Sequence, residues 1–151
     1  MTYLLDVNLL IAMAWPSHTH HRIAQAWFRR CGRAGWATCP ITQTGFVRIS
    51  SNAKFIDGAV SPHGALRLLE SVMQSTRHTF WPDDLSLADA TIQVDSPGSV
   101  WTQVIGHRQV TDAYLLSLAR KHQGKLATLD QAVPSLVPDA GQQDDCLELI
   151  E

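Results

Sequence analysis

Short apolar runs alternate with helix-like segments along this chain, and that alternation restricts the fold more than any other feature. The runs have the length and residue types of buried strands, and they lie at residues 3–5, 36–39, 79–81, 125–129 and 146–150. Between them, apolar residues recur at helical spacing. Because parallel strands need a crossover that is usually a helix, we predict an α/β fold with a parallel sheet of four to five strands.

Local signals predict where several of the helices begin and end. Residues 7–14 form an apolar first helix, and Ser17 is a plausible N-cap for the second. Pro62 suits the first position of a further helix. Thr111 is expected to cap a strongly periodic helix that stops at Gly124. A helix is one option for residues 85–92, followed by a turn at 96–98.

Length and composition are those of an ordinary globular protein. The 151 residues, 45% hydrophobic and 17% charged, are expected to form one domain over residues 1–151. No apolar run reaches the ~18–20 residues that span a bilayer, and no secretory signal is evident. Three widely spaced cysteines, Cys31, Cys39 and Cys146, favour reduced thiols and therefore a cytoplasmic location.

Three aspartates lie where such a sheet would bring them together. Asp6 and Asp130 directly follow predicted strands, and Asp112 opens the periodic helix. Ligands of open α/β sheets bind in the crevice at the carboxyl ends of the strands, so we expect these carboxylates to share one site. Because their charges repel, protons or a hard cation must offset them.

The chemistry that this arrangement favours is hydrolysis of a phosphodiester. Mg²⁺ prefers oxygen ligands and keeps several waters, so Asp6 and Asp112 would hold the ion, with Asp130 binding directly or through water. A bound cation polarises a phosphate oxygen and lowers the pKa of a water molecule. In-line attack on phosphorus then requires positioning and charge neutralisation from the protein.

Four strings of residues, in order along nearly the whole chain, resemble the PIN-domain ribonucleases, and most closely the VapC-like toxins of bacterial toxin–antitoxin pairs. They are LLDVNLLIA, TCPITQTGFVRI, GHRQVTDAYLLSLA and KLATLD. The resemblance implies a three-layer α/β/α fold and an endoribonuclease that uses Mg²⁺ or Mn²⁺. It also implies a homodimer and a small antitoxin whose C-terminal tail enters the active-site groove.

The resemblance assigns roles to individual residues. Asp6, Asp112 and Asp130 match the first, third and fourth acidic positions of the family, which are catalytic and bind the metal. The supporting positions would be Asn8, Thr128 and Arg48, the last as a phosphate contact.

The second acidic position departs from the family pattern. A glutamate is common there, in the helix after the second strand, and this chain has Gln43. An amide keeps an acceptor oxygen but loses the negative charge, so metal affinity should be lower. Asp84 and Asp89 are the nearby carboxylates that could substitute.

Two other functions compete with the nuclease. Gln43 is also compatible with a weak or inactive PIN-like binding module. A phosphatase of the haloacid-dehalogenase type also places an aspartate after its first strand, but it needs a second one two residues later, where this chain has Asn8.

Overall fold

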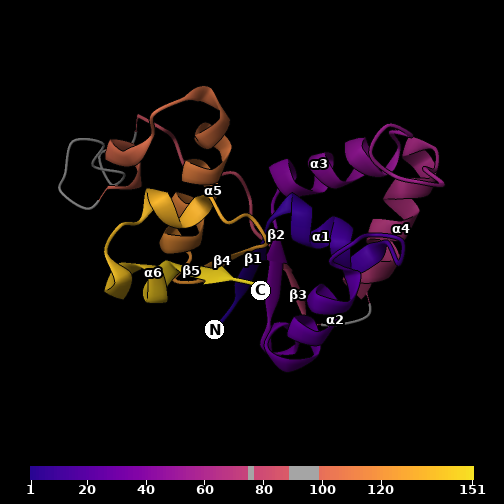
Figure 1. Cartoon of the computed structure of the whole chain (residues 1–151), viewed down its shortest axis with the longest axis horizontal. Coiled ribbons are helices and arrows are strands. Elements are labelled where there is room, and N and C mark those ends of the chain that lie inside the picture. The colour runs from indigo at the N-terminus through magenta and orange to yellow at the C-terminus, as the bar shows by residue number, and fades with distance from the viewer. Residues whose placement is uncertain (75–76, 89–98) are drawn as a thin grey trace.

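The computed structural model describes residues 1–74, 77–88 and 99–151, which build a single five-stranded sheet (Figure 1). All of its strand pairs are parallel. The strand order is β3-β2-β1-β4-β5. The strands are β1 (Tyr3–Leu5), β2 (Trp36–Thr38), β3 (His78–Phe80), β4 (Lys125–Thr128) and β5 (Leu147–Leu149). The predicted α/β fold with a parallel sheet is therefore confirmed.

Helices cover both faces of this sheet. In Figure 1, helices α1 to α4 gather on one side of the strands and α5 and α6 on the other, which gives three layers. Their bounds are α1 (Val7–Ala14), α2 (His21–Arg30), α3 (Pro40–Ser50), α4 (Pro62–Gln74), α5 (Val110–Lys121) and α6 (Ala140–Cys146). Short 3-10 turns complete the described elements: η1 (Gly32–Ala34), η3 (Val100–Gln103), η4 (His107–Gln109) and η5 (Val133–Leu136).

The strands supply two separate hydrophobic cores because successive side chains point to opposite faces. Leu4 and Leu126 face the core beneath α5, whereas their neighbours Leu5 and Ala127 face the core beneath α1 and α2. All four side chains are fully buried. The continuous apolar runs in the sequence thus reflect strands that are covered on both faces.

The order of the strands creates a switch point at the centre of the sheet. From β1 the chain adds β2 and then β3 on one side, and afterwards places β4 and β5 on the other side of β1. At such a point the crossovers leave in opposite directions, which opens a crevice at the carboxyl ends of the strands. β1 and β4, the strands that precede Asp6 and Asp130, are the neighbours at this point.

Several predicted boundaries are wrong. Ser17 lies in a turn, and α2 begins only at His21. Thr111 does not cap α5, because the turn η4 runs directly into the helix and places Thr111 inside its first turn. Residues 85–88 are not helical, and the remainder of the predicted helix and the turn at 96–98 lie outside the described residues. All three cysteines are free.

Glycine at position 45 permits a close approach of α3 to α1. A Cβ atom there would lie 2.6 Å from Cγ2 of Val7, which is nearer than real Cβ contacts allow. The contact fixes α3, which carries Gln43 and Arg48, against the helix that carries Asn8. In the described ranges, no helix has both the length and the apolar character needed to cross a membrane.

Candidate active site

Asp6 links the end of β1 to the start of α1. It is the N-cap of α1, and its Oδ1 accepts a 2.6 Å hydrogen bond from the backbone N–H of Val7. Its own N–H donates to the carbonyl of Ala127 in β4. Only 8% of Asp6 is exposed. The backbone bond to β4 and the N-cap bond to α1 together hold this carboxylate in one orientation.

Thr128, the last residue of β4, connects the polar groups of the site. Its hydroxyl is fully buried and donates to Oδ2 of Asp6 at 2.7 Å. The Thr128 hydroxyl oxygen itself accepts from Nδ2 of Asn8 at 3.2 Å and from the backbone N–H of Asp130 at 3.1 Å. Asn8 Oδ1 in turn accepts from the N–H of Leu129. Asn8 and Thr128 therefore do lie beside Asp6, as the sequence predicted.

The three aspartates are close enough in the structure for the charge of one to affect the pKa of another. Asp112 lies half-buried in the first turn of α5, and burial raises its pKa to about 6, with the charges of Asp6 and Asp130 adding to the rise. Burial also raises the pKa of Asp6, and Asp130 contributes, although the hydrogen bonds from Thr128 and Val7 oppose the rise. Asp130 itself is exposed. Mutual repulsion of this kind marks groups that share a site.

The donors of this cluster suit a hard cation, but they do not form a complete cage. Carboxylate, amide and hydroxyl oxygens are the ligands that Mg²⁺ and Mn²⁺ prefer. Among residues 1–74, 77–88 and 99–151, however, no three His, Cys, Asp or Glu side chains are placed to hold one ion together. Mg²⁺ sites commonly use one or two carboxylates, waters and substrate phosphates, and the cluster fits that pattern.

Comparison with known proteins identifies the family. The family model described as the PIN domain matches residues 3–136. Ribonuclease VapC39 of Mycobacterium tuberculosis is 46% identical over 133 residues, which cover 88% of this chain and 91% of that protein. This chain belongs to the PIN-domain family, in the VapC group. Ribonuclease VapC29 of the same organism is 42% identical over 139 residues, 92% of this chain and 93% of its own length.

Solved structures agree with this fold. VapBC2 from Rickettsia felis, crystallised with a DNA fragment from its promoter, has a chain that matches with a TM-score of 0.61 and 16% identity. The match covers 100% of both chains. PAE2754 from Pyrobaculum aerophilum matches with a TM-score of 0.50 and 19% identity, over 97% of this chain and 83% of its own. At sequence identities this low, the two matches show that the fold is shared and nothing more.

Gln43 of this PIN domain lies among the uncharged side chains of Thr38, Met73 and His78, and we call this group the neutral corner. Its Nε2 donates to the hydroxyl of Thr38 at 2.8 Å, and lies 3.5 Å from the sulfur of Met73. Thr38 is the last residue of β2, and its hydroxyl also lies 2.8 Å from Nε2 of His78. Burial lowers the pKa of His78, which favours the neutral imidazole. The amide is thus held by uncharged partners.

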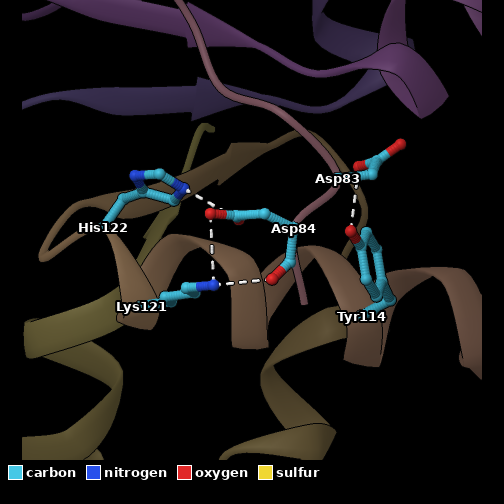
Figure 2. A network of polar contacts seen from close by, with 5 residues as sticks. All are labelled: Asp83, Asp84, Tyr114, Lys121 and His122. Atoms are coloured by element: carbon cyan, nitrogen blue, oxygen red, sulfur yellow. Dashed lines mark hydrogen bonds and ion pairs between the residues drawn. The ribbon is translucent and has the colours of Figure 1, made fainter. Parts of the chain in front are cut away.

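The remaining predicted residues are more peripheral. Arg48 is exposed in the last turn of α3. Asp84 does not replace the missing glutamate, because its carboxylate pairs with Lys121 at 3.2 Å and with His122 at 3.6 Å (Figure 2). Asp89 lies outside the described residues.

Sequence analysis missed Asp83 as a candidate. It follows β3, as Asp6 and Asp130 follow β1 and β4, so the same rule would have found it. Its Oδ1 accepts a 2.9 Å hydrogen bond from the hydroxyl of Tyr114 in α5. Figure 2 shows the carboxylate of Asp83 at the Tyr114 hydroxyl, and that of Asp84 beside Lys121 and His122 at the C-terminal end of the helix.

Proposed function

We propose that this protein is a metal-dependent endoribonuclease and the toxin of a toxin–antitoxin pair. The observation that carries the proposal is the electrostatic coupling of Asp6, Asp112 and Asp130 at the switch point of the sheet. The family relationship to the VapC ribonucleases supports the substrate class.

Asp6 and Asp112 are the residues that would hold Mg²⁺ or Mn²⁺, with Asp130 as the third acid. When bound, such an ion polarises a phosphate oxygen and supplies a nucleophilic water at neutral pH. It also offsets the repulsion from Asp6 and Asp130, which adds to the effect of burial on the pKa of Asp112.

The neighbours of the carboxylates have a positioning role. The Thr128 hydroxyl binds one oxygen of Asp6 and the Val7 N–H binds the other, so each oxygen keeps one lone pair for the site. Asn8 holds the Thr128 hydroxyl and the backbone of Leu129, so it fixes the end of β4 against α1. Hydrogen bonds of this kind orient ligating carboxylates and tune their basicity. Arg48, exposed on α3, is the proposed contact for an RNA phosphate.

A catalytically weak binding module is the second candidate, and the neutral corner around Gln43 favours it. Without a fourth charge the cluster attracts a divalent cation less strongly. Measured cleavage distinguishes the two candidates.

The decisive experiment is cleavage of RNA by the purified protein with Mg²⁺ or Mn²⁺, and with EDTA. We expect cleavage with either metal and none with EDTA. Asp6→Asn should reduce the rate by at least about a hundredfold, since the lost carboxylate serves a metal that contributes several kcal/mol to the transition state. Asp57→Asn, which changes an exposed loop carboxylate, is the matched control. Equal cleavage by the two variants would refute the nuclease site.

The partners follow from the same proposal. We expect a homodimer, and a small antitoxin that silences it by covering the acidic cluster. Three free cysteines fit a cytoplasmic location, where thiols stay reduced. Co-purification with the product of a neighbouring gene, and loss of cleavage in that complex, is the corresponding measurement.

A further inference from the structure

A shallow groove of about 360 Å³ lies next to the acidic cluster. Its volume falls within the range of small-ligand sites, about 300–1,000 Å³. Aliphatic side chains form most of its lining: Ile41 from the first turn of α3, Leu85 and Leu87 from the segment after β3, and Val110 from the first turn of α5. Leu87 and Val110 are 48% and 40% exposed, so apolar surface remains open to solvent there.

Among the described residues that line the groove, Asp83 alone carries a charge. Its Oδ1 accepts from the Tyr114 hydroxyl, and within the described ranges its Oδ2 has no hydrogen-bond partner. Tyr114 is buried, and both this burial and the nearby Asp83 raise the pKa of the phenol, so it stays a donor. The side chain of Asp83 is therefore held by Tyr114, while its other lone pairs face solvent and are open to a ligand.

The groove adjoins the first turn of α5, which also carries Asp112. Thr111 lines the groove, and the next residue is Asp112. A polymer whose scissile phosphate lies at the aspartates would consequently place an adjacent nucleotide within reach of Asp83.

We propose that this groove binds a guanine base of the RNA next to the cleaved bond, with Asp83 as the specificity-determining acceptor. The inference rests on the proposed nuclease function and adds a base preference to it. Aliphatic walls suit the flat apolar faces of a base, and the carboxylate supplies the selectivity.

Guanine fits the Asp83 carboxylate better than the other bases because of the hydrogen-bond donors on its Watson–Crick edge. It presents two adjacent donors, the N1–H and the 2-amino group, which match the two oxygens of a carboxylate. Oδ1 can accept from Tyr114 and from guanine at once, since each carboxylate oxygen has two lone pairs. Adenine and cytosine offer a single amino donor beside an acceptor nitrogen that a carboxylate repels. Uracil places carbonyl oxygens on both sides of its one donor.

The test measures binding, so that it does not depend on catalysis. Labelled uridine-rich RNAs that differ only in one central base are titrated in Mg²⁺ against the Asp6→Asn protein, and fluorescence anisotropy is recorded. We expect guanine to bind about tenfold more tightly than adenine, as a bidentate contact to a base allows. Hypoxanthine, which lacks the 2-amino group, should fall between them.

Two further substitutions, each made in the Asp6→Asn protein, locate the effect. Asp83→Asn keeps an acceptor oxygen for Tyr114 but turns a donor toward the base, so the preference for guanine should disappear. Asp84→Asn is the matched control, because that carboxylate pairs with Lys121 and His122 at the other end of α5, and the preference should remain. Thermal denaturation checks that both variants fold.

The outcomes separate this inference from the proposed function. Cleavage by the unmodified protein with equal binding of all the RNAs would keep the nuclease and overturn the guanine site. A groove that takes a cationic side chain of a protein partner would give that same equal binding. Guanine preference that Asp83→Asn abolishes, in a protein that cleaves no RNA, would support the groove and remove the nuclease.

Discussion

Two buried threonines, Thr128 and Thr38, end the two strands that flank β1. One binds a charged carboxylate and the other binds uncharged side chains. Thr128 at the end of β4 donates to a carboxylate oxygen of Asp6. Thr38 at the end of β2 accepts from the amide of Gln43 and pairs with the imidazole of His78. Both threonines are fully buried. The same local geometry therefore supports an acidic corner on one side of β1 and a neutral corner on the other.

The comparison shows that the negative charge of the site lies on one side of β1. In the acidic corner burial raises the pKa of Asp6 and of Asp112, and the neighbouring carboxylates add to the rise. In the neutral corner burial lowers the pKa of His78, so neither His78 nor Gln43 contributes a charge near neutral pH. A cation at this edge is therefore expected to bind on the β1–β4 side.

Between the two corners, the largest difference is expected when the threonine hydroxyl is removed from each in turn. Thr128→Val should lower RNA cleavage by about 10- to 100-fold, because Asp6 loses the donor that orients it. Thr38→Val should change the rate only slightly while lowering the free energy of unfolding by about 1–3 kcal/mol, since Gln43 and His78 lose a buried partner. Rates and denaturant melts of both variants provide the measurement. Equal losses of activity would show that the two corners act as one site.

A smaller effect concerns the pH dependence of stability without metal. The pKa of Asp112 in the folded protein, about 6, is higher than the ordinary aspartate value of 3.8, so the folded state binds more protons between those pH values. The free energy of unfolding should therefore fall as pH rises from about 4 to about 6. Because Asp112 is half-exposed, we expect a change of about 1 kcal/mol.

Asp112→Asn tests that expectation directly. It should flatten the profile and make the metal-free protein more stable at pH 7.5, and Mg²⁺ should stabilise the unmodified protein but not this variant. Thermal denaturation of both proteins at pH 5 and pH 7.5, with and without Mg²⁺, gives the four values required for each. A variant with an unchanged pH profile would contradict the assigned crowding of charge.

The smallest effect is a change of charge in the neutral corner. Gln43→Glu should raise the pKa of His78 by about one unit, because a carboxylate near Thr38 favours the protonated imidazole. NMR titration of the His78 ring protons measures this shift. Gln43→Ala, which removes the amide without adding charge, is the control. If Gln43→Glu also lowers the Mg²⁺ concentration needed for cleavage, the neutral corner contributes to the metal site.

Sequence patterns predicted the central strands β1, β2 and β4 well because these strands are covered on both faces. A run such as residues 125–129 is apolar throughout, and β4 is found at Lys125–Thr128. The first helix was predicted at its observed bounds, Val7–Ala14. The grouping of Asp6 with Asn8 and Thr128 was implied by the family resemblance, and hydrogen bonds join the three side chains in the structure.

Other features depend on contacts that no local pattern contains. The start of α5 was misplaced because the turn η4 leads into it and makes a capping threonine unnecessary. The environment of Gln43 combines Met73 from α4 with His78 from β3. The partnership of Asp83 with Tyr114 joins residues 31 positions apart and could only be found in three dimensions.

The hydrogen bond between Thr128 and Asp6 joins residues separated by 122 positions. During translation the first aspartate emerges from the ribosome long before the strand that completes its surroundings. Pairing over such a distance also slows folding, because the loop must close before its contacts form. A nuclease assembled in this way would be unable to cut its own messenger until most of the message had been read.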